Sequence, residues 1–104
     1  MNSVFMDDIN LVILEGTIAY EPNVQIRTGK TAHNFLVKQQ THSGSFMYPV
    51  VYWEFPESTP YIRENLTQGK YVRIRGHLQT ITDNTKDSIT VACKVCVDSI
   101  LFAE

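Results

Sequence analysis

One stretch of this chain has the features of a helix, and strand-like segments lie on both sides of it. Ser58 or Thr59 can cap the stretch, Pro60 suits its first turn and Gly69 suits its exit. Tyr61, Ile62 and Leu66 supply its apolar side. The strand-like segments are residues 10–19, the pair 24–27 and 32–40, 46–55, 70–78 and 88–102. Their order around a single helix limits the possible folds more than any other feature of the sequence.

The segments themselves carry strand signals. Residues 70–78 alternate, with Val72, Ile74 and Leu78 expected inward and with Tyr71, Arg73, Arg75 and His77 expected outward. The first segment is apolar on both faces, and Gly16 in its middle indicates a bend, as at a barrel corner. Pro49 cannot donate to a strand ladder, so we expect its strand to be at an edge or bulged there.

Strand, strand, strand, helix, strand, strand is the order of an OB-fold. We therefore predict an all-β, five-stranded Greek-key barrel with one short helix between strands 3 and 4. The 104 residues suffice for one domain, 1–104, in which 1–9 form a loosely packed or flexible N-terminal arm. No apolar run is long enough to span a membrane and no signal peptide is evident, so we expect a cytoplasmic protein.

Two short motifs have plainer explanations than the chemistry they evoke. Gly29-Lys30-Thr31 ends like a phosphate-binding loop, but the required first glycine is replaced by Val24 and no helix follows. We predict a hairpin turn there, with a cation at its tip. Cys93 and Cys96 lie three apart on a strand and so point to opposite faces, which predicts two semi-buried structural thiols. We expect no metal, no cofactor and no enzymatic activity, because no metal-ligand set, carboxylate pair or nucleophile with its base has usable spacing.

Three stretches, in order, resemble the bacterial single-stranded DNA-binding protein family: "NLVILEGTIAYEPNVQIRTGKTAHNFLV", "PVVYWE" and "LTQGKYVRIRGHLQT". The resemblance implies an OB-fold and places Trp53 where that family stacks a base. It places Met47 at another stacking position, and Phe46 or Tyr48 could substitute if Pro49 shifts the register. The hairpin after Gln40 is shorter than in that family, and the stretch "DSILFAE" does not resemble that family's acidic tip. These departures are closer to primosomal replication protein B, a dimeric relative with the same fold. The sequence alone does not decide between it and a phage, plasmid or mobile-element version.

Cationic and aromatic side chains complete the predicted DNA-binding surface. These are Lys30, Lys38, Arg73, Arg75, Lys86 and Tyr71, in addition to Trp53, Met47, Phe46 and Tyr48. Each has a structural alternative, since Trp53 could belong to the core and the outward residues of 70–78 could be a solvated strand face. The net charge of −2 does not favour nucleic-acid binding, but a local basic stripe would suffice.

The predicted function is sequence-independent binding of single-stranded DNA in replication, recombination or repair. The alternative is a protein-interaction OB module, or a primosome-type accessory protein, with weak or no nucleic-acid binding. Leu11 and Ile13 are apolar on the strand face that the core does not use, which predicts a homo-oligomer, either a dimer or a tetramer. Replication or repair proteins are the expected partners, and no membrane is involved.

Overall fold

The structure is a computed structural model that describes residues 8–55, 59–83 and 90–103. Residues 1–7 of the predicted N-terminal arm lie outside this description, and so does Lys86. The elements are β1 (Val12–Ile18), β2 (Asn23–Arg27), β3 (Lys30–Thr41), β4 (Gly44–Trp53), α1 (Thr59–Asn65), β5 (Tyr71–Asp83) and β6 (Thr90–Phe102). Two strands are longer than predicted: β3 begins at Lys30 and ends at Thr41, and β5 continues to Asp83.

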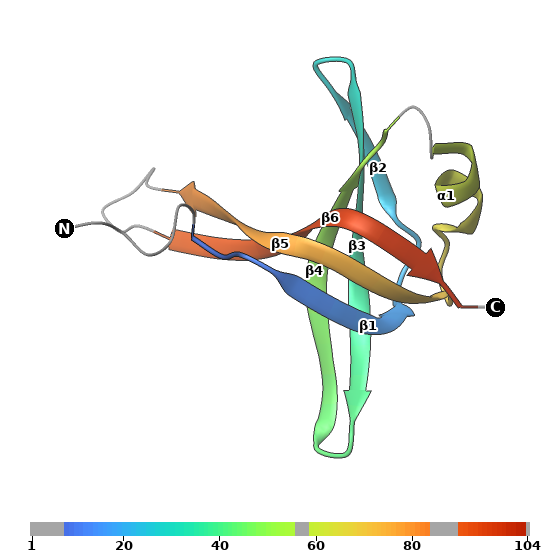
Figure 1. Cartoon of the computed structure of the whole chain (residues 1–104), viewed down its shortest axis with the longest axis vertical. Coiled ribbons are helices and arrows are strands. Elements are labelled where there is room, and N and C mark those ends of the chain that lie inside the picture. The colour runs from blue at the N-terminus through green and yellow to red at the C-terminus, as the bar shows by residue number, and fades with distance from the viewer. Residues whose placement is uncertain (1–7, 56–58, 84–89, 104) are drawn as a thin grey trace.

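Five of the strands form a closed sheet (Figure 1). β1 pairs with β5, β5 with β6, β6 with β4 and β4 with β3. The sheet closes where β3 returns to β1, with Lys38 opposite Thr17 and Val37 opposite Ile18. All pairings are antiparallel except the short one between β4 and β6. β2 pairs with the outer edge of β3. The predicted all-β class is confirmed as a closed, barrel-like sheet with one short helix.

The core lies inside the closed sheet and receives residues from α1. Val72 and Ile74 are fully buried, as predicted, and Ile62 and Leu66 bring the helix into the same cluster. Tyr61, predicted on the apolar side of the helix, is instead exposed. Its ring and that of Phe102 form a T-shaped pair with a centroid distance of 6.0 Å. The remaining members of the cluster are Leu14, Ile18, Phe35, Val37, Val50, Tyr52, Val95 and Val97.

Gly16 lies where β1 passes from β5 to β3. An added Cβ there would come within 2.4 Å of the carbonyl oxygen of Lys38. The two backbones approach too closely for any side chain, so the glycine predicted to mark a corner is required by the closure of the sheet.

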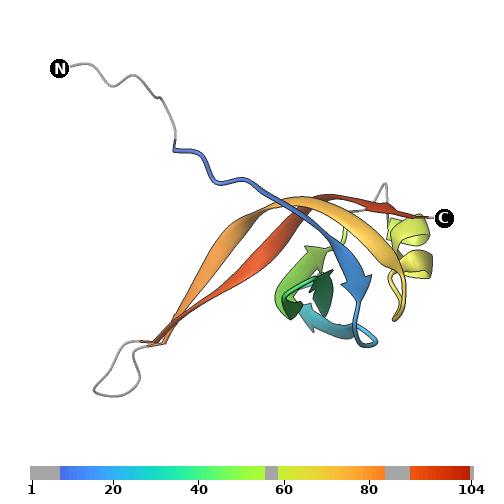
Figure 2. The same cartoon turned by 90° about the horizontal axis from the view of Figure 1, so that it is seen from below.

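Two hairpins extend beyond the closed part of the sheet, one made by β3 and β4 and the other by β5 and β6 (Figures 1 and 2). The second arm explains a wrong prediction, because Leu78 is 46% exposed instead of inward and buried. β1 pairs with β5 only as far as Gly76. Beyond it the Asn10 side chain bonds the backbone N–H and C=O of Leu78 but does not cover the Leu78 side chain. Cys93 lies on the same arm and is exposed rather than semi-buried, while Cys96 is partly buried; both thiols are free.

The turn at Thr28 and Gly29 has the predicted form. It is a two-residue connection between Arg27 and Lys30, and both turn residues have positive φ angles, 49° and 77°. Such a pair of angles is typical of a type I′ hairpin, whose twist matches that of the strands. Lys30 therefore does not lie at the tip of the turn, where we expected a cation, but is the first residue of β3.

Candidate nucleic-acid interface

The outer face of β3 and β4 carries Trp53 and Met47 together. Along β4, Val50 and Tyr52 point into the core, so positions 47, 49, 51 and 53 lie on the other face, where Val51 is itself buried. The register from Ala32–Trp53 to Thr41–Gly44 is continuous, which places exposed Lys38 directly beside Met47. An aromatic side chain, a thioether and a cation therefore share one face.

The same register separates Phe46 and Tyr48 from this face. Phe46 and Tyr48 point to the same face of β4 as the core residues Val50 and Tyr52. They are exposed only because the β3–β4 arm extends past the closed sheet. Pro49 pairs with Leu36 without a register shift, so the idea that it could bring Phe46 or Tyr48 to the stacking positions is wrong. The expectation that the strand of Pro49 is an edge strand or is bulged is wrong, because β4 lies between β3 and β6 in continuous register; Pro49 lies just beyond the short pairing of Val50 and Val51 with β6.

Trp53 lines a cleft of about 1020 Å³ at the end of β4. It is half-buried and does not belong to the core cluster, which receives its neighbour Tyr52 instead. Lys30 and the turn before it line the same cleft, and Gln79 lines it from β5. The remaining lining residues are Thr31, Glu54, Phe55 and Pro60. The structure thus brings together Trp53 and Lys30, which are 23 positions apart in the sequence.

A second, smaller hollow of about 220 Å³ lies farther along the same sheet. Leu36, Pro49 and Lys94 are among its lining residues. The parallel pairing of Val51 with Cys96 brings β6 alongside β4 and so places Lys94 next to Pro49. Sequence reasoning missed both Lys94 and Gln79 as candidates. The alternation of β6 could have indicated Lys94, because inward Val95 and Val97 require residue 94 to point outward.

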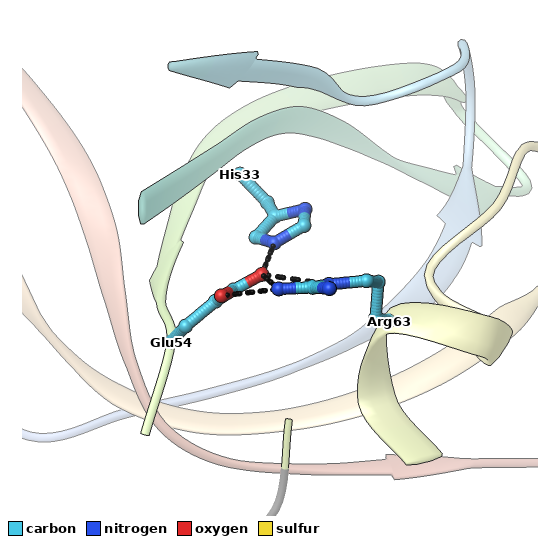
Figure 3. A network of polar contacts seen from close by, with 3 residues as sticks. All are labelled: His33, Glu54 and Arg63. Atoms are coloured by element: carbon cyan, nitrogen blue, oxygen red, sulfur yellow. Dashed lines mark hydrogen bonds and ion pairs between the residues drawn. The ribbon is translucent and has the colours of Figure 1, made fainter. Parts of the chain in front are cut away.

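A polar network holds the residue next to Trp53 (Figure 3). The Nε2 atom of His33 lies 2.6 Å from Oε2 of Glu54, and Arg63 donates to both carboxylate oxygens at 2.7 to 3.0 Å. The network joins β3, the end of β4 and α1. Hydrogen bonds from Arg63 lower the pKa of Glu54 most; burial opposes them, and His33 lowers that pKa further. Glu54 is therefore an ionised carboxylate in the cleft at neutral pH.

The predicted residues of β5 lie on another part of the sheet. Tyr71, Arg73 and Arg75 are exposed, as expected, but β5 lies between β1 and β6 and does not pair with β3 or β4. Nε of Arg73 donates to Oε2 of Glu15 at 2.8 Å, so this cation is already paired. The described residues therefore do not form one groove from Lys30 through the two arginines.

Leu11 and Ile13 are exposed by 50% and 65%. Ile13 lies beside Arg75 on the outer face of β1 and β5. Residues 12–16 of β1 pair with β5 on one side, whereas β3 reaches β1 only at Thr17 and Ile18. Part of the other edge of β1 is thus open next to two exposed apolar side chains.

Comparison with known proteins does not assign the chain to a family: no family model matches it, and no curated protein matches it. Within residues 8–55, 59–83 and 90–103, no group of three or more His, Cys, Asp or Glu side chains is placed to hold a metal ion. No helix in the described part of the chain is long and apolar enough to cross a membrane.

Proposed function

We propose that the protein is an OB-fold that binds single-stranded DNA without strong dependence on sequence. The pairing order β1–β3–β4–β6–β5, closing back on β1, supports an OB-fold, as does the position of α1 between β4 and β5. OB-folds bind oligonucleotides on the face of their second and third strands and with nearby loops. In this chain those strands correspond to β3 and β4.

The observation that carries the proposal is the placement of Trp53 and Lys30 in one cleft on that side of the sheet. A base stacked on an indole contributes about 1–3 kcal/mol, and every base has a face that can stack. Lys30 can neutralise a neighbouring phosphate, and Lys94 and Lys38 continue the cationic path toward Met47. From Trp53 to Met47 the strand rises by roughly 20 Å, which is enough for a few extended nucleotides.

A fluorescence titration tests this function directly, because Trp53 is the single tryptophan of the chain. Oligo(dT) should quench its emission, and Trp53→Ala should weaken binding by about 1–3 kcal/mol. Phe46→Ala is the matched control, since it removes an exposed aromatic ring from the opposite face of the same strand. Unchanged emission, together with binding that survives Trp53→Ala, would remove the cleft from the interface.

A second candidate is a protein-interaction OB module or a primosome-type accessory protein. The pairing of Arg73 with Glu15 favours it, because the outward stripe of β5 then offers fewer free cations than the sequence suggests. The net charge of −2 favours it also. Failure to bind oligo(dT) even at low salt would select this alternative.

We also propose that the protein forms a homo-oligomer through β1. The open edge of β1, exposed Leu11 and exposed Ile13 lie together, and a two-fold contact would cover them in both copies at once. A dimer requires one such contact and a tetramer a second, different one. The biological setting proposed for this assembly is replication, recombination or repair, with proteins of those processes as partners.

A further inference from the structure

Glu54 is an unexpected residue for a cleft that receives a polyanion. It follows Trp53 directly and lines the same cleft as Lys30. Its backbone is fixed, since its N–H donates to the carbonyl oxygen of Thr31 at 3.0 Å. A phosphate against the free side of this carboxylate would meet an acceptor oxygen and no donor, so we expect that side to face a group other than phosphate.

The carboxylate retains one acceptor position. Oε2 receives three hydrogen bonds, from Nε and Nη2 of Arg63 and from Nε2 of His33. Oε1 receives one, from Nη2 of Arg63 at 2.7 Å. Each carboxylate oxygen can accept about two hydrogen bonds, so Oε1 has room for one more. The Glu54 side chain is still 13% exposed, which leaves a route by which a ligand can reach it.

The nucleobases differ in what they can offer to such an acceptor. Cytosine, adenine and guanine carry exocyclic amino groups that donate hydrogen bonds, as in carboxylate recognition of cytosine N4. Thymine and uracil have carbonyl oxygens instead, and their single ring N–H lies between two of them. A carboxylate that meets the edge of a base in the cleft therefore attracts an amino group and repels the carbonyl oxygens of thymine.

We propose that Glu54 gives the cleft that it lines with Trp53 a preference for amino-bearing bases and a bias against thymine and uracil. This inference rests on the proposed single-strand binding. Lys30 would hold the adjacent phosphate, and the amide of Gln79, which both donates and accepts, does not oppose any base. The preference is confined to this one base position, so the rest of the strand is still bound by stacking and charge.

The first experiment compares oligo(dC) with oligo(dT) of equal length, at fixed salt and mildly alkaline pH so that cytosine stays neutral. One hydrogen bond to a charged acceptor lies at the lower end of base discrimination, so oligo(dC) should bind about five- to tenfold more tightly. Glu54→Gln should bring this ratio close to one. Glu15→Gln, the matched control, also removes an arginine-paired carboxylate but lies on β1, away from the cleft, and should keep the ratio.

A second comparison needs no variant and so does not depend on whether Glu54→Gln folds. Oligonucleotides with N4,N4-dimethylcytosine cannot donate from N4, whereas N4-methylcytosine keeps one N–H. The wild-type protein should lose its preference with the dimethyl base and retain most of it with the monomethyl base. Equal affinity for oligo(dC), oligo(dT) and the dimethyl oligonucleotide would overturn the inference while leaving single-strand binding intact. Binding to none of them would instead overturn the proposed function.

Discussion

The lysines of the outer face should determine how DNA binding responds to salt. Lys30 lines the main cleft, Lys94 lines the smaller hollow, and Lys38 lies beside Met47. Each phosphate neutralised on a single strand contributes about −0.7 to the slope of log affinity against log salt. Three contacts give a slope of about −2.1. Affinity for oligo(dT) should thus fall about 18-fold when salt rises from about 50 to about 200 mM.

Lys94→Ala is the decisive perturbation, because it removes one cation that lies beside β4 only through the parallel β4–β6 pairing. The slope should flatten to about −1.4, so that the same rise in salt weakens binding only about sevenfold. The loss should be similar for all base sequences, since a lysine that meets a phosphate reads no base. Fluorescence anisotropy with labelled oligonucleotides at several salt concentrations measures both quantities.

Arg73→Ala is the matched charge control. Because Arg73 is paired with Glu15 on the β1–β5 face, its removal should leave the salt slope near −2.1. If Arg73→Ala flattens the slope as much as Lys94→Ala does, the strand crosses the β5 face and the proposed path is wrong. A wild-type slope indistinguishable from zero would show that the lysines contact no phosphate.

Three further predictions concern stability and assembly. Gly16→Ala should lower the free energy of unfolding by about 1–3 kcal/mol or more, because the new Cβ would press on the Lys38 carbonyl oxygen. An unchanged urea midpoint would contradict the close approach of the β1 and β3 backbones at this position. The pKa of Glu54 is lowered in the folded state, so its stabilising contribution is present above its ordinary value of 4.5 and is lost as pH falls below it. Urea unfolding across this range should show that loss, and Arg63→Ala should reduce it. Ile13→Asp should convert the oligomer to a monomer, as measured by light scattering. Ile81→Asp, at an exposed isoleucine on the β5–β6 arm, should not. A wild-type protein that is monomeric at micromolar concentration would refute the β1 contact.

Much of the local structure could be predicted from the sequence because its causes are local. Alternation predicted that Val72 and Ile74 are buried and that Arg73 and Arg75 point outward. The glycine of the Thr28–Gly29 turn supplied the positive φ angle that a two-residue hairpin needs. A glycine in mid-strand indicated the corner at Gly16. Each of these inferences depends on neighbouring residues, whose side-chain period and backbone freedom do not change with the partner strand.

Which surfaces meet was decided only by the tertiary structure. Alternation places Arg73 and Trp53 both outward, but the pairing order of the strands puts them on different parts of the closed sheet. The same pairing brings Lys94 beside β4 and leaves Leu78 on an arm that has no third strand to cover it. Strand pairing joins residues far apart in the chain, and no local period encodes the partner. The sequence therefore determines the direction of each side chain, whereas closure of the sheet determines its neighbours.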